Sequence, residues 1–219
     1  KMACRIMLGE RIADLGLPAD PMGGGHVSVK EAVMPFNRFS GTDALLGPEM
    51  RSTGEVMGIA ADFPTAFAKA QAAAGSALPS SGTVFLSVTD EDKAAAVGIA
   101  LLLHDLGFTI VATRGTAQAL RPYGVPVETL NKIGEGSPHV VDRIEAGDVD
   151  LVINTPTGSG ARSDGWEIRR AAIAHGVPCI TTLAGGLAAA RAIRAARMSG
   201  EAEVRSLQEI HGMAVAETA

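Results

Sequence analysis

Apolar and polar residues follow two different patterns before and after residue 76. From residue 83 onward, short runs of β-branched and apolar residues alternate with longer stretches in which apolar residues recur every three or four positions. The short runs predict strands, and the longer stretches predict amphipathic helices. The predicted strands are 83–88, 108–113, 125–130, 149–155 and 177–182, with helices near 92–106, 116–123, 138–146, 165–175 and 186–198.

Glycine residues stand at or next to the start of several predicted strands, each after a predicted helix: Gly107, Gly124, Gly147 and Gly176. A glycine just past a helix end typically adopts the left-handed conformation that stops the helix. Strands and helices joined by such short connections predict a parallel sheet with helices on both faces. The predicted fold is therefore α/β, with an open five-stranded parallel doubly wound sheet.

The first 75 residues have a less regular pattern. The predicted elements are a helix over 1–16, a strand over 26–36, a loop over 41–58, and a helix over 63–74 that Asp62 caps. The next stretch, SALPSSG, has the small, polar and proline-containing composition of a linker. We therefore expect a small α+β region before the regular sheet.

Composition and charge narrow the function classes. Hydrophobic residues make up 47% of the chain and charged residues 20%, which is an ordinary globular balance. The net charge of −5 argues against general binding to nucleic acids or anionic membranes. Cys4 and Cys179 alone imply no disulfide framework and fit a reducing, cytoplasmic setting. No apolar run reaches the roughly 20 residues of a membrane helix. The chain lacks Met at position 1, and its first residues are typical of a fragment rather than of a signal peptide.

Polar side chains follow every predicted strand. In chain order these are Ser87 and Thr89; Thr113, Gly115 and Thr116; Asn131 and Lys132; Asn154, Thr155 and Thr157; and Thr181 and Thr182. In a doubly wound sheet, ligands bind in the crevice beyond the carboxyl ends of the strands. We expect these side chains to share that crevice.

The residue types at this edge favour an anion. Hydroxyls and backbone N–H groups suit phosphate or carboxylate oxygens, Lys93 and Lys132 add positive charge, and Gly115 allows a close backbone approach. One Thr-rich edge alone is typical of helix capping, but five polar edges with two lysines favour an anion site. Asp164 is expected either to cap the helix over 165–175 or to accept a hydrogen bond from a ribose hydroxyl.

The sequence offers little for catalysis. His104 and His175 lie near predicted helix ends, where an imidazolium favours the helix dipole, and no Ser-His-Asp order is evident. Metal-binding spacings such as CxxC or HExxH are absent from the sequence, and so are the phosphate loops GxxxxGK[ST] and GxGxxG opening a helix. We expect a binding protein with no catalytic residues, metal or cofactor of its own.

Several stretches resemble one known family. SVKEAVMPFNRF, LLGPEMRSTGEVMG, FLSVTDEDK, ATRGTA, LNKIGEGSPHVVDRI and VINTPTG are similar to the C-terminal end of the large subunit of carbamoyl-phosphate synthase. The resemblance runs from about residue 1 to His211. It implies a tail of the second ATP-grasp synthetase unit over 1–75, a linker over 76–82, an allosteric domain with the methylglyoxal-synthase-like fold over 83–211, and a flexible tail over 212–219.

The resemblance also implies a parent enzyme and its partners. The parent makes carbamoyl phosphate from bicarbonate, glutamine-derived ammonia and ATP with Mg or Mn, for arginine and pyrimidine synthesis. Its partners would be the rest of the large subunit and a small glutaminase subunit. Because the phosphate cover and metal carboxylates of an ATP-grasp unit would lie upstream of residue 1, we expect this chain to bind effectors without turning over ATP.

In that family, the last domain binds UMP as an inhibitor and IMP at an overlapping place, while ornithine activates at the junction with the synthetase unit. The positions that match the nucleotide contacts are Ser87, Lys93, Thr113, Gly115, Thr116, Lys132, Asn154, Thr155, Thr157 and Asp164. The ornithine contacts match Glu31 and Thr181. Pro156 departs from the family pattern, since some members have Thr there.

Three alternatives remain open at this stage. Methylglyoxal synthase, acting on dihydroxyacetone phosphate, has a similar phosphate edge, but this sequence lacks the family's histidine and offers Asp90 and Asp164 instead. The cyclohydrolase domain of purine synthesis also begins similarly, although GPEMRSTGE does not belong to it. An assembly module would bind no nucleotide at all.

Overall fold

The computed structural model describes residues 1–16, 25–33, 54–155, 164–200 and 204–210. The chain divides into two compact units, one made of Lys1–His26 with Glu203–Ala219 and the other of Val27–Ala202. In the first unit, the predicted helix over 1–16 is interrupted. Helix α1 spans Met2–Met7, and a 3₁₀ helix, η1, follows at Ile12–Leu15.

The second unit contains a five-stranded sheet of order β5-β4-β3-β6-β7, in which every neighbouring pair is parallel. The strands are β3 (Thr83–Ser87), β4 (Thr109–Thr113), β5 (Val127–Leu130), β6 (Leu151–Asn154) and β7 (Cys179–Ile180). Strand β6 is buried along its whole length, as expected where helices cover both faces. The predicted α/β fold with a five-stranded parallel doubly wound sheet is confirmed.

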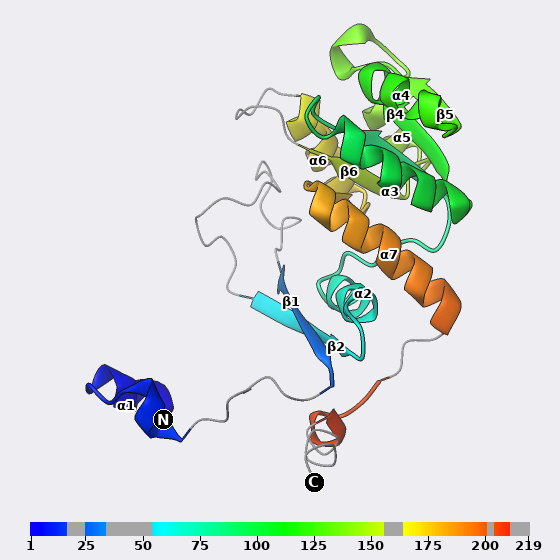
Figure 1. Ribbon diagram of the computed structural model, residues 1–219. Helices are drawn as coiled ribbons and strands as arrows, with labels where there is room; N and C mark the ends of the chain where they lie inside the picture. Colours follow the sequence, from blue (N-terminus) through cyan, green and yellow to red (C-terminus); the bar gives the residue numbers. More distant parts are fainter. Residues whose placement is uncertain (17–24, 34–53, 156–163, 201–203, 211–219) are drawn as a thin grey trace. The chain divides into compact units, whose positions relative to one another are not determined.

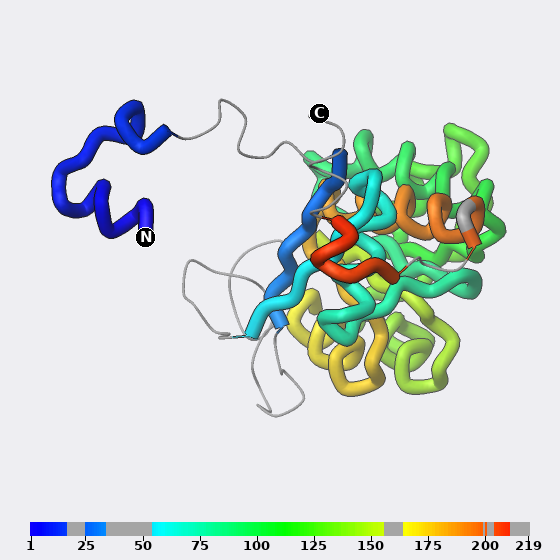
Figure 2. The backbone as a smooth tube through the Cα atoms, turned by 90° about the horizontal axis from the view of Figure 1, so that it is seen from below, coloured from blue at the N-terminus to red at the C-terminus, as the bar shows by residue number. Residues whose placement is uncertain are grey.

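Helices lie on both faces of this sheet (Figures 1 and 2). Figure 2 shows α7 (orange) on one side and α5 and α6 (yellow-green and yellow) on the other. The bounds are α3 (Lys93–Asp105), α4 (Arg114–Leu120), α5 (Val140–Glu145), α6 (Asp164–Ala174) and α7 (Leu183–Ser199), with short 3₁₀ turns η3 (Arg121–Tyr123) and η4 (Ile133–Glu135).

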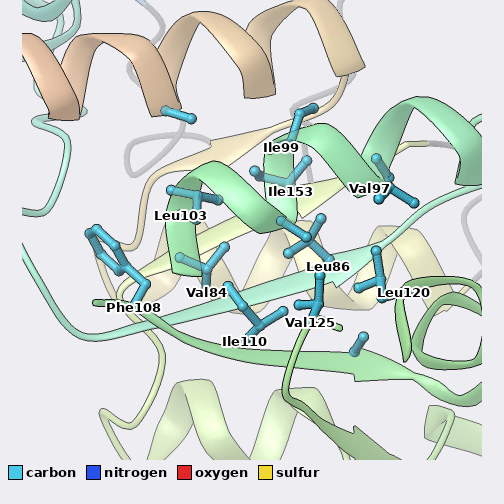
Figure 3. Close-up of a cluster of buried hydrophobic side chains, with 14 of the residues drawn as sticks. Val84, Leu86, Val97, Ile99, Leu103, Phe108, Ile110, Leu120, Val125 and Ile153 are labelled. Carbon is cyan, nitrogen blue, oxygen red and sulfur yellow. The ribbon is translucent and has the colours of Figure 1, made fainter. Parts of the chain in front are cut away.

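Each face of the sheet has its own apolar core. On the α3 side, alternate residues of β3, Val84 and Leu86, pack with Ile99 and Leu103 of α3 and with Ile153 of β6 (Figure 3). The intervening residue Phe85 faces the other side, where its cluster includes Val111, Ile144, Val152 and Ile168. The period-two alternation of β3 thus supplies both cores, which fixes the strand register and with it the positions of the strand ends.

A two-stranded antiparallel ribbon precedes the sheet. Strand β1 (Val27–Val33) pairs with β2 (Gly54–Ala60), and helix α2 (Phe63–Ala73) packs against both strands and against α7. The Asp62 carboxylate accepts a hydrogen bond from the Thr65 backbone N–H at 2.9 Å, as expected of its cap.

The prediction of a loop over 41–58 is wrong for its last five residues, because Gly54–Gly58 belong to β2. The two glycines hid the strand, since glycine is rare in strand interiors. At Gly58, a Cβ would lie 2.0 Å from the Ala66 carbonyl oxygen and 2.6 Å from the Ala70 backbone nitrogen. Glycine is therefore required there for α2 to approach the ribbon.

Arg197, near the end of α7, contacts the predicted linker over 76–82. Its guanidinium donates to the carbonyl oxygens of Ser80 and Leu106 and lies over the Phe108 ring, 5.5 Å from the ring centroid. These contacts tie the segment before β3 to the sheet unit. The domain boundaries at residues 75 and 83 stay a prediction.

Candidate functional site

Three hydroxyl groups meet at the carboxyl edge of the sheet. The Ser87 and Thr113 hydroxyl oxygens lie 3.3 Å apart, and the Thr113 hydroxyl donates to Thr116 Oγ1 at 3.4 Å. Thr116 Oγ1 also accepts from the Val88 backbone N–H at 3.3 Å. Thr113 occupies the N-cap position of α4 without making a side-chain cap bond, so its hydroxyl belongs to this cluster and not to capping.

These contacts are longer than the usual O–H···O distance of about 2.7–2.8 Å. The hydroxyls therefore hold one another loosely and keep donor capacity for another acceptor. Thr116 is 1% exposed and Ser87 and Thr113 are half-buried, so an incoming group would meet a largely desolvated set of donors. We name this set, Ser87, Thr113 and Thr116, the hydroxyl cluster.

The Lys93 ammonium lies beside the hydroxyl cluster. A Cβ built on Gly115 would lie 3.2 Å from Lys93 Nζ, so the absence of a side chain at Gly115 gives the ammonium its place. Lys93 Nζ pairs with the Asp90 carboxylate at 2.6 Å. That bond, with the charge of Lys93, lowers the pKa of Asp90, and the Lys132 charge lowers it further. The Asp90 carboxylate thus pairs with Lys93 and also feels the charge of Lys132.

Asn154 and Thr155 extend the edge along β6. The Asn154 carboxamide donates to the Ser87 carbonyl oxygen at 3.2 Å and accepts from the Arg169 guanidinium at 3.4 Å. Arg169 is 2% exposed, so a buried guanidinium orients this amide from behind. Thr155 Oγ1 accepts from the Thr89 backbone N–H at 2.9 Å, which ties the β3–α3 turn to the end of β6.

The remaining predicted residues divide into three groups. Asp164 is exposed and is the first residue of α6, so it lies one position inside the helix it was expected to cap. Thr157 and Pro156 lie outside the described residues. Thr181 follows β7 and is half-buried, and its neighbour Thr182 caps α7 by accepting from the Gly185 N–H at 3.1 Å.

Glu31 lies apart from this edge, on β1. Its carboxylate accepts from the Gln71 carboxamide of α2 at 3.0 Å. Burial raises the pKa of Glu31 above its ordinary value of 4.5, while the hydrogen bond from Gln71 opposes the rise. The carboxylate is thus held at a partly desolvated position between the ribbon and α2.

A glutamine at this position should change how stability depends on pH. The pKa of Glu31 is raised in the folded chain, so its contribution to stability is fully present below the unfolded pKa and is lost as the pH rises through the folded pKa. Relative to the wild type, Glu31→Gln should therefore gain unfolding free energy as the pH rises above the ordinary carboxyl pKa of 4.5 and through the raised pKa of Glu31 in the folded chain. Urea unfolding at a series of pH values measures this, with Glu55→Gln, an exposed carboxylate on β2, as the control. Parallel pH profiles for wild type and Glu31→Gln would contradict it.

No pattern in the sequence predicts the cavity at the opposite edge of the sheet. A cavity of about 410 Å³ is lined by the ends of α5 and α6 and the segments entering β6 and β7, including Glu145, Asp150, His175 and Pro178. Because helices run against the strands they connect, this is the amino edge, away from the hydroxyl cluster. This cavity and the hydroxyl cluster therefore lie at opposite edges of the sheet. The hydroxyl donors favour the carboxyl edge as the site for an anion.

Metal ligands do not gather in the described part of the chain: no three His, Cys, Asp or Glu side chains there form a group that could hold an ion. Among the same residues, no helix combines the length and apolar character needed to cross a membrane.

Comparison with known proteins gives two results. Residues 95–181 match the MGS-like domain family, and this range runs from the first turn of α3 to the residue after β7. This chain carries an MGS-like domain. The match includes much of the predicted edge, although Ser87 and Lys93 lie just before its first residue.

Carbamoyl phosphate synthase large chains are similar over almost the whole chain. Those of Rubrobacter xylanophilus and Gemmatimonas aurantiaca are 54% and 51% identical, each over 96% of this chain, and that of Rhodopirellula baltica is 48% identical over 94%. The similarity corresponds to the C-terminal region of those proteins, as the predicted family resemblance required. The chain spans only about a fifth of the length of these relatives, at 19–20% of each.

Proposed function

We propose that this chain is the effector-binding region of a carbamoyl phosphate synthase large chain. Its MGS-like domain binds a nucleoside monophosphate, UMP or IMP, with the phosphate at the hydroxyl cluster between Lys93 and Lys132. The observation that carries the proposal is the meeting of three hydroxyls at one sheet edge, with Lys93 Nζ beside Gly115 and Lys132 two residues past the end of the neighbouring strand β5.

The chemistry of this edge suits a phosphate dianion. Hydrogen bonds from neutral hydroxyls and from ammonium groups to a charged oxygen are shorter and stronger than those between neutral groups. The loosely bonded cluster supplies the hydroxyls, and Asn154 and Thr155 continue the polar edge at the end of β6. We propose Thr157, which lies outside the described residues, as a further contact of the nucleotide. Asp164 would accept from a ribose hydroxyl.

The second effector is proposed at the ribbon. Glu31 is a partly desolvated carboxylate on β1, and a carboxylate is the natural partner for the amino group of ornithine. Thr181, after β7, would supply a hydroxyl to the same ligand. The parent enzyme would work in the cytoplasm with ATP and Mg or Mn, together with the rest of the large chain and a glutaminase subunit, and its chemistry would not reside in this chain.

Titration calorimetry tests the nucleotide proposal. UMP and IMP are titrated into the chain, with uridine as the control that lacks the phosphate. The proposal expects saturable binding of at least one monophosphate and at least about tenfold weaker binding of uridine, because the phosphate makes the charge-assisted contacts. Equal affinity for UMP and uridine, or heat from neither monophosphate, would contradict it.

A further inference from the structure

Asp90 pairs with one of the two ammonium groups that are proposed to bind the phosphate. Its carboxylate is 2.6 Å from Lys93 Nζ, and its side chain is 94% exposed. Lys93 is 27% exposed and belongs to the first turn of α3, while Asp90 lies in the turn that joins β3 to α3. The ammonium group of the partly buried Lys93 is thus paired with a carboxylate that lies in solvent.

The same charge also acts on Lys132. The positive charges of Lys93 and Lys132 both lower the pKa of Asp90, so it is ionised at neutral pH. Lys93, one of the two lysines that would attract a phosphate, is therefore already paired with an internal anion. A phosphate entering the hydroxyl cluster meets that anion as a like charge.

We propose that Asp90 is an internal competitor of the phosphate: it holds Lys93 while the site is empty and weakens nucleotide binding by occupying that ammonium and repelling the dianion. The proposal rests on the proposed function of the same site. Its consequence is a site tuned to release its ligand readily, so that occupancy follows nucleotide concentration.

The exposure of Asp90 makes this competition reversible. An exposed pair between flexible side chains is weak, since solvent screens it and holding it costs side-chain entropy. Asp90 can therefore turn into solvent without breaking any buried contact, while Lys93 Nζ lies beside Gly115 at the sheet edge. When the phosphate binds, it replaces the Asp90 carboxylate as the partner of the Lys93 ammonium.

The test compares Asp90→Asn with wild type by calorimetric titration with UMP. Asparagine keeps the size of the side chain and removes its charge. We expect UMP to bind about threefold to tenfold more tightly to Asp90→Asn. Glu91→Gln is the matched control, because it removes the adjacent exposed carboxylate and the same net charge, and Glu91 forms no ion pair with another of the described residues.

Repeating the comparison in a Lys93→Met variant tests whether the effect of Asp90 depends on Lys93. In Lys93→Met, which has no ammonium for Asp90 to occupy, adding Asp90→Asn should change UMP affinity by clearly less than it does in wild type. Equal gains in Asp90→Asn and Glu91→Gln would overturn the competitor, because they would indicate a general charge effect. Unchanged affinity in Asp90→Asn, with wild type binding UMP normally, would overturn it and leave the proposed function standing. Loss of UMP binding in every protein, wild type included, would remove the proposed function and the competitor together.

Discussion

Replacing Lys93 and Lys132 together with methionine is expected to weaken UMP binding by about 30-fold to 1,000-fold. Each ammonium would contribute a charge-assisted contact of about 1–2 kcal/mol to the phosphate, and a change of about 1.4 kcal/mol is tenfold in affinity. Methionine keeps most of the length of the side chain, so the loss reports the charge and not the packing. Calorimetric titration with UMP measures the effect.

The matched control for this pair is Lys30→Met. Lys30 lies on β1, where it is exposed and paired with Glu55 at 2.6 Å. The substitution therefore removes a positive charge that does not lie at the carboxyl edge of the sheet. We expect that variant to bind UMP as the wild type does. A double variant that keeps wild-type affinity while its thermal unfolding is unchanged would show that the two lysines hold no phosphate.

Truncating Phe85 should produce the largest loss of stability. Phe85 is 0% exposed on the central strand β3 and packs in the core on the α5 and α6 side of the sheet. Phe→Ala in a packed core typically costs about 3–5 kcal/mol, because the loss of apolar burial is joined by the cost of a cavity. Urea unfolding followed by circular dichroism measures the change.

Tyr123→Ala is the control for that truncation. Tyr123 is 62% exposed, so the same removal of an aromatic ring should change the unfolding free energy by no more than about 0.5 kcal/mol. If Phe85→Ala lost no more stability than Tyr123→Ala, the core described on that face of the sheet would be wrong.

Much of the sheet was predictable from the sequence. The apolar runs that became β3, β4 and β6 have no helical period, and glycines such as Gly107 and Gly147 do adopt positive φ at the helix ends. The observed strands are shorter than the predicted runs, because apolar residues also fill the connections next to a buried strand. Val125 is buried, for example, although β5 begins at Val127.

The ribbon was harder to predict. Gly54 and Gly58 concealed β2, and the need for Gly58 arises from the close approach of α2, which is a tertiary contact that no local pattern carries. The cap of α5 was also hard to predict. The ring nitrogen of His139 accepts a hydrogen bond from the Asp142 N–H at 3.3 Å and so caps this helix. Histidine is not among the residues that a cap rule favours.

The candidate site was likewise only partly predictable from the sequence. Topology alone brings Ser87, Thr113 and Asn154 to one edge, because parallel strands end together. The partners of these residues depend on side-chain geometry instead. The sequence did not predict that Asp90 pairs with Lys93, or that the buried Arg169 orients Asn154.

The most direct test of the phosphate site is a nuclear magnetic resonance titration of the ¹⁵N-labelled chain with UMP, because it separates the two edges of the sheet. Gly115 and Thr116 report the carboxyl edge, while Gly147 and Gly176 line the hollow at the amino edge. We predict that the backbone amide signals of Gly115 and Thr116 shift in a saturable way and that those of Gly147 and Gly176 do not move. Saturable shifts at Gly147 and Gly176, with Gly115 and Thr116 unchanged, would contradict the account.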